Sequence, residues 1–205
     1  CKNNTEINGS RKAHIVDGIA LTKFIHWLEN EVDGTKNNYT EISLARKLLN
    51  FRKRNKDFKG LSFGTISSLG SNGAVIHYQP EKETDKDLSD NDIYLLDSGG
   101  QYKFGTTDVT RTILNKRDKK LKDFNEISNN YTLVLKGHIA VAASHFKKGE
   151  TGKNLDNKAR KFLIKNGLNY DHGTGHGVGS YLGVHEGPQS ISPKSSVPLL
   201  EGMII

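Results

Sequence analysis

The stretch Asp97-Ser-Gly-Gly-Gln-Tyr-Lys-Phe-Gly-Thr-Thr-Asp108 decides the fold class of this chain. It joins two runs of β-strand composition, Ile93–Leu96 and Val109–Ile113, and an aspartate stands at each junction. The glycines inside the stretch would interrupt one long strand, so the pattern predicts a β-hairpin with a loop. In a hairpin the two aspartates can lie opposite each other on one face, and like charges that close are destabilising without a cation between them. The stretch therefore indicates a divalent metal site, with ordinary turn aspartates beside glycines as the alternative.

Composition bounds the class of protein. The 205 residues correspond to about one domain, 34% of them are hydrophobic, and the mean hydropathy is −0.61. No apolar run approaches the roughly 20 residues that span a bilayer, and no charged-then-apolar leader is present. The sole cysteine, Cys1, excludes an internal disulfide and suits a reducing compartment. We therefore predict a cytoplasmic protein that has no membrane partner.

The net charge of +7 raises the question of nucleic-acid binding. The densest cationic patch, residues 52–56, ends a helical pattern, where cations complement the helix macrodipole and are expected to stay solvated. Elsewhere lysines alternate with acidic residues, and no basic stripe with interleaved aromatic residues appears. The sequence therefore predicts no nucleic-acid partner.

Hydrophobic periodicity predicts an α+β chain. Helices are expected over about residues 11–31, 41–54, 119–145 and 154–165, with Ser10 and Thr40 as N-caps and Gly167 as a C-cap. Short β segments are expected over 61–69 and 74–78, and the second of these holds His77. The order of elements repeats, so 203–205 would begin a second hairpin that is cut before its carboxylates.

A glycine-rich segment, His172-Gly-Thr-Gly-His176-Gly-Val-Gly179, follows the last helix. Four glycines disfavour a helix, so the segment predicts a tight backbone that lets two imidazoles approach a crowded centre. A phosphate-binding loop is a rival, but no Gly-Lys-Ser/Thr follows. A surface loop with incidental histidines is the other alternative. His77 and His185 are each ambiguous by themselves, because a lone histidine is often a satisfied core residue.

Together these motifs resemble the catalytic domain of eukaryotic cytosolic-type Xaa-Pro aminopeptidases (aminopeptidase P), which belong to the pita-bread metallopeptidases with methionine aminopeptidase and prolidase. The stretches that carry the resemblance are Leu96–Tyr102, Gly105–Thr112, His172–Gly179 and Val184–Pro188. The resemblance implies an α+β pita-bread (creatinase/aminopeptidase) fold with pseudo-twofold αα-β-hairpin halves, the second incomplete. Residues 1–10 would be a polar, mobile lead-in segment, and 11–205 a metallopeptidase catalytic domain that lacks its C-terminal part.

The resemblance also implies the site residues. Asp97, Asp108 and His176 would bind two divalent metal ions, with Mn²⁺ as the expected metal. The residues His77, His172 and His185 would be catalytic and would bind the substrate. Phe104 stands where close relatives tend to have aspartate, and it is expected to lie in the loop without touching the metals.

The implied reaction removes the N-terminal residue from peptides with proline at position 2 by attack of a dimetal-bound hydroxide. Prolidase or methionine aminopeptidase of the same fold is an alternative, as is a non-catalytic peptidase-like binding domain. The peptide substrate would be the partner, and a homodimer is compatible with the resemblance. The family's two further glutamate ligands would follow residue 205, so this chain alone is expected to bind metal weakly and to have little activity.

Overall fold

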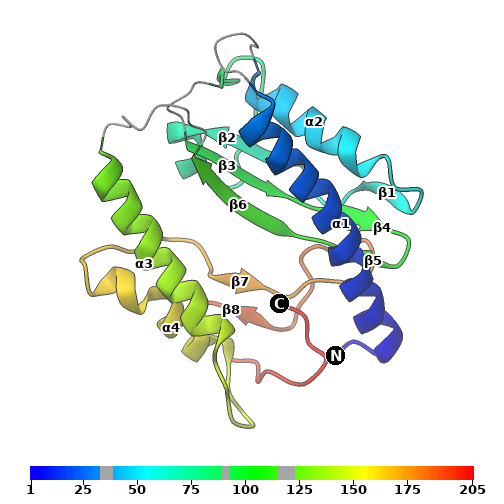
Figure 1. Cartoon of the computed structure of the whole chain (residues 1–205). Helices are drawn as coiled ribbons and strands as arrows, with labels where there is room; N and C mark the ends of the chain where they lie inside the picture. The colour runs from blue at the N-terminus through cyan, green and yellow to red at the C-terminus, as the bar shows by residue number, and fades with distance from the viewer. Residues whose placement is uncertain (33–38, 89–92, 115–122) are drawn as a thin grey trace. The chain divides into compact units, whose positions relative to one another are not determined.

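The structure is a computed structural model that describes residues 1–32, 39–88, 93–114 and 123–205 (Figure 1). The chain forms two compact units. We call residues 4–121 and 179–184 the N-terminal unit, and residues 1–3, 122–178 and 185–205 the C-terminal unit. Among the described residues, no helix is long and apolar enough to cross a membrane.

The N-terminal unit consists of two helices on a three-stranded antiparallel sheet. Helices α1 (Asn4–Asn30) and α2 (Glu41–Arg52) lie side by side along one face of this sheet (Figure 1). The strand order is β2-β3-β6, formed by β2 (Ile66–Leu69), β3 (Ile93–Ser98) and β6 (Val109–Leu114). The core between helices and sheet contains Leu21, Phe24, Trp27, Leu28, Leu44, Leu48, Leu69, Tyr94, Leu96 and Ile113.

A second sheet extends the β3–β6 hairpin. It has the order β1-β4-β5, formed by β1 (Phe58–Leu61), β4 (Gly100–Tyr102) and β5 (Gly105–Thr106). The predicted hairpin is therefore confirmed, and its loop is itself a short antiparallel pair. A 3-10 helix, η1 (Gly70–Ala74), follows β2.

The two helix starts differ in how well the sequence predicted them. Thr40 caps α2 as predicted: its hydroxyl accepts from Ser43 N, and the Ser43 hydroxyl accepts from Thr40 N, which is a capping box. Helix α1 begins at Asn4, so the predicted start near Arg11 and the Ser10 cap are wrong. Ser10 is buried inside the helix, which means that tertiary packing extends the helix beyond the apparent cap.

Two further expectations are corrected in this unit. Residues 74–78 form no strand; the segment leaves η1 through turns, and Val75 and Ile76 are 55% and 56% exposed. Arg52, expected to stay solvated, is completely buried because an acidic partner lies inside the core. The remaining cations of that patch fit the expectation, since Lys53, Arg54 and Lys56 are exposed.

The C-terminal unit is built on a helix pair. Helices α3 (Phe124–Ala142) and α4 (Gly152–Ile164) lie side by side (Figure 1), and Leu133 and Gly137 are the buried residues of α3. Gly167, predicted as the C-cap of α4, follows that helix with φ +72°, a conformation in which glycine is favoured. The strands β7 (Gly175–His176) and β8 (Ser190–Ile191) pair antiparallel.

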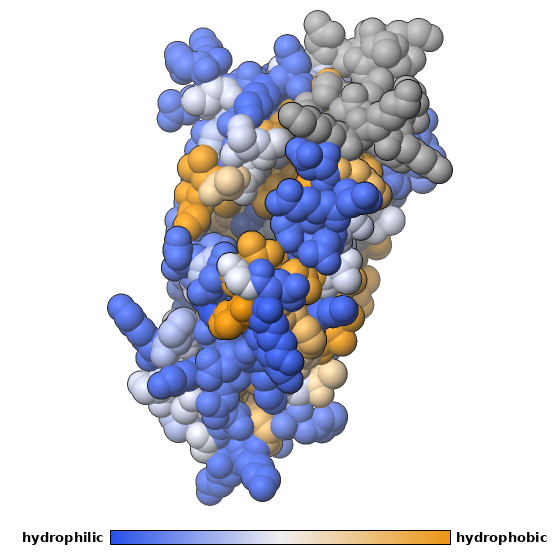
Figure 2. All heavy atoms as spheres, turned by 90° about the vertical axis from the view of Figure 1, so that its left-hand side faces the viewer, coloured by the Kyte–Doolittle hydropathy of each residue, from blue (hydrophilic) through white to orange (hydrophobic). Residues whose placement is uncertain are grey.

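Much of α3 is apolar but not covered within the described residues. Figure 2 turns the left-hand side of Figure 1, where α3 lies, towards the viewer, and hydrophobic surface appears there among hydrophilic surface. The most exposed apolar side chains of the helix are Phe124, Tyr131, Val134, Leu135 and Ile139. Residues 203–205, predicted to begin a strand, lie outside any assigned strand, although the carbonyl oxygen of Ile204 accepts from Val178 N at 3.1 Å.

Candidate functional site

Strand register places the two predicted metal-binding aspartates. Asp97 lies on β3 opposite Thr110, and Ser98 lies opposite Val109, so Asp108 is one position beyond the last pair. Because side chains alternate along a strand, Asp97, Thr110 and Asp108 share one face of the sheet. Both carboxylates are half-buried, and they are diagonal neighbours rather than directly opposite each other. The predicted shared face is confirmed, and it is the face turned away from α1 and α2.

Hydrogen bonds fix the backbone next to Asp108. The hydroxyl of the buried Thr107 accepts from Gly100 N at 2.9 Å, and the Thr107 carbonyl accepts from the Ser62 hydroxyl at 2.8 Å. Gly99 passes so close that a Cβ atom there would come 1.9 Å from the Thr107 carbonyl oxygen. Only glycine fits at this crossing, which explains one of the glycines in the hairpin.

A buried ion pair lies behind Asp97. Arg52 donates through Nε and Nη2 to the two carboxylate oxygens of Asp17, at 2.8 and 2.9 Å, and both side chains are at most 1% exposed. Nη2 also donates to the hydroxyl of Ser98, the residue after Asp97, at 3.1 Å. Tyr102 donates to Asp17 at 2.7 Å. Burial and the negative charge of Asp17 raise the pKa of Tyr102, so its hydroxyl keeps the proton that it donates.

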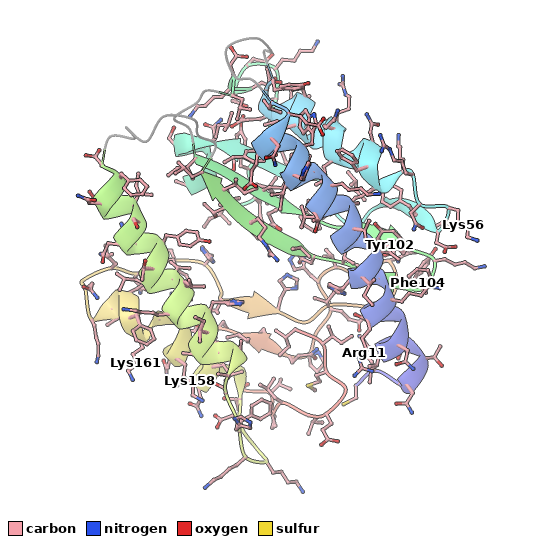
Figure 3. The ribbon with its side chains drawn as sticks, viewed as in Figure 1. Arg11, Lys56, Tyr102, Phe104, Lys158 and Lys161 are labelled. Atoms are coloured by element: carbon pink, nitrogen blue, oxygen red, sulfur yellow. The ribbon has the colours of Figure 1, made fainter. Side chains whose placement is uncertain are left out.

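Phe104 lies between β4 and β5, in the loop where it was expected. Its ring stacks on that of Tyr102, with centroids 6.1 Å apart, and Lys12 Nζ lies 4.2 Å from the Phe104 ring centroid. Figure 3 labels Tyr102 and Phe104 at the same end of the N-terminal unit. Phe104 therefore has a packing role with α1 and β4.

His77 is on an exposed turn instead of at a strand end. Its φ is +57°, an uncommon conformation for a residue with a side chain, and such strain often marks functional sites. The neighbouring Tyr78 is buried, so the turn is anchored directly after the histidine.

In the C-terminal unit, a side-chain clamp from α4 holds the segment that carries His172. Arg160 pairs with Asp156 at 2.8 Å and donates to the carbonyl oxygens of Tyr170 and His172, the latter at 2.7 Å. Asp156 also accepts from the Thr174 hydroxyl at 2.6 Å. His172 itself is exposed, and its ring stacks on Tyr170 with centroids 4.7 Å apart.

His176 and His185 lie together in the same unit, with ring centroids 4.1 Å apart. Nδ1 of His176 lies 2.9 Å from the carbonyl oxygen of Gly177. Because a carbonyl only accepts, we assign the proton to Nδ1 and the lone pair to Nε2, the tautomer that metal-binding histidines commonly have. The same carbonyl accepts from Glu186 N at 2.8 Å. A Cβ atom at Gly177 would come 2.0 Å from the Glu186 carbonyl oxygen, so the tight backbone needs glycine there.

The predicted metal ligands come from both units: Asp97 and Asp108 from the N-terminal unit, and His176 from the C-terminal unit. Among the residues that the structure describes, no three His, Cys, Asp or Glu side chains are grouped closely enough to hold a metal ion. What the structure brings together is therefore the aspartate pair in one unit and the His176–His185 pair in the other.

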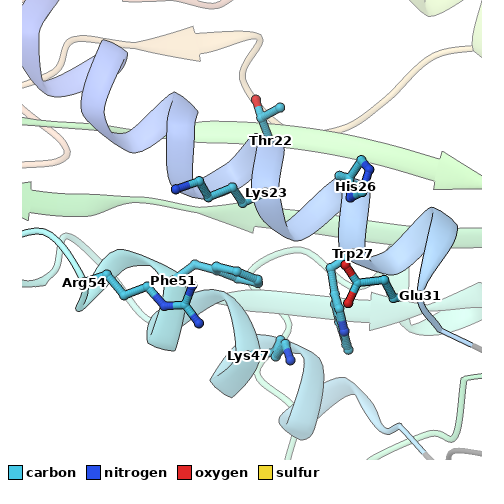
Figure 4. A pocket seen from close by; sticks show the side chains of 8 residues that line it. All are labelled: Thr22, Lys23, His26, Trp27, Glu31, Lys47, Phe51 and Arg54. Atoms are coloured by element: carbon cyan, nitrogen blue, oxygen red, sulfur yellow. The ribbon is translucent and has the colours of Figure 1, made fainter.

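A pocket of about 460 Å³ lies between α1 and α2 (Figure 4), and no predicted site residue lines it. Two of its cations lie over aromatic rings: Lys47 Nζ is 4.3 Å from the Trp27 centroid, and Arg54 Cζ is 4.9 Å from that of Phe51. Trp27 is only 6% exposed, so its ring offers little open face to a ligand. We interpret it as the surface groove of the helix pair.

Residues 8–205 match the family model described as metallopeptidase family M24. This chain belongs to metallopeptidase family M24. The probable Xaa-Pro aminopeptidase P of Sordaria macrospora is 49% identical over 207 residues, which cover 100% of this chain and 33% of that relative. The corresponding protein of Podospora anserina is 51% identical over 197 residues, 94% of this chain and 28% of the relative.

Solved structures agree with the M24 assignment. The X-prolyl aminopeptidase of Caenorhabditis elegans, described as a cytosolic enzyme with a di-nuclear active site, has a TM-score of 0.88 and 43% identity over 98% of this chain and 32% of its own. A prolidase from Thermococcus sibiricus has a TM-score of 0.80 and 27% identity over 98% of this chain and 50% of its own. The α+β pita-bread fold is confirmed, and the chain spans about a third of the length of the curated relatives that it matches.

Sequence reasoning missed the buried charges of this M24 chain. Asp17 interrupts the apolar stripe of α1, and Arg52 continues the i, i+4 spacing of Leu44 and Leu48 on α2. A charged residue at a position where the helix pattern expects an apolar one was the available signal. It indicates a buried ion pair, because a buried charge requires an oppositely charged partner. The same signal was present in α4, where Asp156 and Arg160 are both buried.

Proposed function

We propose that the protein containing this chain is a metal-dependent Xaa-Pro aminopeptidase that removes the N-terminal residue from peptides with proline at position 2. The identity of 49% to a probable Xaa-Pro aminopeptidase P carries the proposal. It is supported by the retention of Asp97, Asp108 and His176 at the positions that the motifs imply. The C. elegans enzyme is described as cytosolic, which is compatible with a cytoplasmic location here.

In this proposal Asp97, Asp108 and His176 hold two divalent ions, with Mn²⁺ as the expected metal. The donor set fits, because two carboxylates share one sheet face and the His176 tautomer has its lone pair on Nε2. Bound divalent ions supply an activated water and polarise the carbonyl to be attacked. Two aspartates bring −2 against +4 from two such ions, so the 205 residues alone should bind metal weakly.

The histidines would act on the peptide. His185 is exposed, so its ring can donate a hydrogen bond to a developing oxyanion. His172 and His77 are also exposed and would bind the peptide backbone and the proline ring. Proline has no N–H at the scissile bond, so ring shape and such contacts must replace that hydrogen bond.

The experiment uses the longest natural protein that contains this sequence. Asp97→Ala and Asp108→Ala should each lower Mn²⁺ affinity and Xaa-Pro hydrolysis by more than about a hundredfold, because even substitutions behind metal ligands cost roughly 10–100-fold. Asp57→Ala is the matched control, since Asp57 is an aspartate of the same unit outside the β3–β6 sheet. Retained hydrolysis in Asp97→Ala would remove Asp97 from the site.

A substrate panel separates this reading from its alternatives. Cleavage of an Arg-Pro-Pro peptide, without cleavage of a Gly-Pro dipeptide or a Met-Ala peptide, is the expected result. Cleavage of Gly-Pro would indicate a prolidase, and cleavage of Met-Ala a methionine aminopeptidase. Absence of all three activities in a metal-loaded protein would favour a binding domain. Sedimentation of the same protein would test the homodimer.

A further inference from the structure

A completely buried carboxylate lies at the start of α2. Glu41 is 0% exposed, and its oxygens accept from Leu69 N and the Tyr78 hydroxyl, each at 2.6 Å. They also accept from Asn72 Nδ2 at 3.0 and 3.1 Å and from Lys86 N at 3.3 Å. Leu69 is the last residue of β2, and the other three donors belong to the connection between β2 and β3, so one side chain from α2 holds that connection at its start and along its length.

Capping of α2 does not explain this arrangement. The first helical N–H groups have other acceptors: Thr40 Oγ1 accepts from Ser43 N, and Asp85 Oδ1 accepts from Ile42 N at 3.0 Å. The backbone N–H of Glu41 donates to the Lys86 carbonyl at 3.1 Å. The Glu41 carboxylate is therefore directed to the end of β2 and to the connection that follows it, where hydrogen bonds and the helix N-terminus stabilise it.

His77 is held within this connection. Asn72 and Tyr78, two of the donors to Glu41, stand on either side of it in the sequence, and Asn72 Nδ2 lies 2.8 Å from the Tyr78 hydroxyl oxygen. The Tyr78 N–H donates to the Val75 carbonyl at 3.2 Å, which closes the turn around His77. A left-handed φ of +57° persists only when surrounding contacts over-determine it. The contacts of Asn72 and Tyr78 to Glu41 meet this requirement, together with the hydrogen bonds that both side chains make to Thr84.

The hydroxyl of Tyr78 remains a hydrogen-bond donor at neutral pH. Burial and the neighbouring Glu41 carboxylate raise the pKa of Tyr78, so the hydroxyl stays protonated and continues to donate.

We propose that Glu41 is a positioning residue that fixes the strained turn carrying His77 through Asn72 and Tyr78. Its consequence for catalysis rests on the proposed peptidase function, whereas the positioning itself does not. Glu41 touches no reacting group, and its effect on a substrate would pass through the orientation of the His77 imidazole.

The first test follows amide hydrogen exchange in three variants of the full chain. In Glu41→Gln the amide group brings N–H donors towards Tyr78 and Lys86, which are themselves donors, so exchange over residues 70–80 should rise about tenfold or more. Tyr78→Phe removes only the hydroxyl and should give a smaller rise in the same residues. Asp85→Asn is the matched control, because it alters a carboxylate at the same helix start without touching Asn72 or Tyr78.

The pattern of exchange decides the outcome. A rise confined to 70–80, with the His77 imidazole signal in NMR broadened or shifted, supports positioning. A rise spread evenly over α1, α2 and the sheet, or one equal to that of Asp85→Asn, would overturn it, because Glu41 would then serve general stability.

The second test measures hydrolysis by the longest natural protein that contains the chain. Glu41→Gln should lower kcat/KM for an Arg-Pro-Pro peptide about tenfold, and Asp85→Asn should leave it unchanged. With His77→Ala already present, Glu41→Gln should have little additional effect, since both act through one imidazole. Additive losses would overturn the link to His77. Failure of the wild-type protein to cleave any Xaa-Pro peptide would defeat the proposed function, and the exchange result would still stand.

Discussion

The aspartates of the N-terminal unit and His172 of the C-terminal unit are held by different means. In the N-terminal unit the aspartates are placed by backbone pairing, since β3 and β6 pair over six residue pairs and Asp97 is within that ladder. In the C-terminal unit β7 and β8 have two residues each, and His172 lies outside them. There the side chain of Arg160 holds the backbone of residues 170 and 172.

The difference teaches how each kind of site residue depends on its surroundings. A carboxylate within a paired strand is displaced only if the sheet is displaced, and the buried Asp17–Arg52 pair lies beneath that sheet. An imidazole on an irregular segment depends on a few side-chain hydrogen bonds, which can open locally without global unfolding. Changes to the Asp17–Arg52 pair should therefore have a global effect on the first unit, whereas changes to the Asp156–Arg160 pair should have a local effect in the second.

The largest effect is expected for Arg52→Met. This change leaves the Asp17 carboxylate buried without its guanidinium partner, and breaking a buried pair in this way costs about 3–5 kcal/mol. Urea denaturation followed by the fluorescence of Trp27, the single tryptophan, reports on this unit. The double variant Asp17→Asn/Arg52→Met should recover part of the loss. A free energy of unfolding within about 1 kcal/mol of wild type in Arg52→Met would show that the pair matters little.

A smaller and more local effect is expected for Arg160→Met. Asp156 keeps the Thr174 hydroxyl as a donor, so the local cost should be about 2–3 kcal/mol and should appear as faster amide exchange over residues 169–174. Lys161→Met is the matched control, because Lys161 is an exposed cation on the same helix (Figure 3). If Arg160→Met lowered the free energy of unfolding measured by Trp27 fluorescence as much as Arg52→Met does, the contrast between the units would be contradicted.

The smallest effect compares two helix starts. Thr40 caps α2 through its hydroxyl, whereas Thr151, at the same position before α4, makes no side-chain cap hydrogen bond. Thr40→Ala should therefore lower the free energy of unfolding by about 1 kcal/mol, and Thr151→Ala by close to zero. Equal losses in thermal or urea denaturation would mean that capping does not distinguish these helices.

Periodicity predicted the helices well, because each has an apolar stripe wide enough to read. The hairpin from Asp97 to Asp108 was predicted for a similar reason: strand composition changes sharply at the glycines. The strand predicted over residues 74–78 was wrong because three consecutive apolar residues resemble a buried strand. The turn that forms there is held by contacts to Glu41, which lies more than thirty residues away in the sequence. The first residues of the third predicted helix, 119–122, lie outside the described residues.

The site was predictable by residue type more than by geometry. The hairpin interpretation allowed Asp97 and Asp108 to share a face, and the strand register bears this out. Nothing in the spacing predicted that His176 would lie beside His185, because a chain reversal through glycines joins them. The buried ion pairs Asp17–Arg52 and Asp156–Arg160 were missed because hydrophobic patterning does not show which two charged side chains pair in the folded protein.

The Gly177 carbonyl has a mechanical consequence. One oxygen atom accepts hydrogen bonds both from Nδ1 of His176 and from the backbone N–H of Glu186, the residue after His185. If that peptide plane rotated, the His176 ring would lose its hydrogen bond to the carbonyl, and the backbone next to His185 would lose its hydrogen bond at the same time. The positions of the two histidines are thus coupled through one C=O group. A ¹³C label on the Gly177 carbonyl should show a changed NMR chemical shift when either hydrogen bond is disturbed.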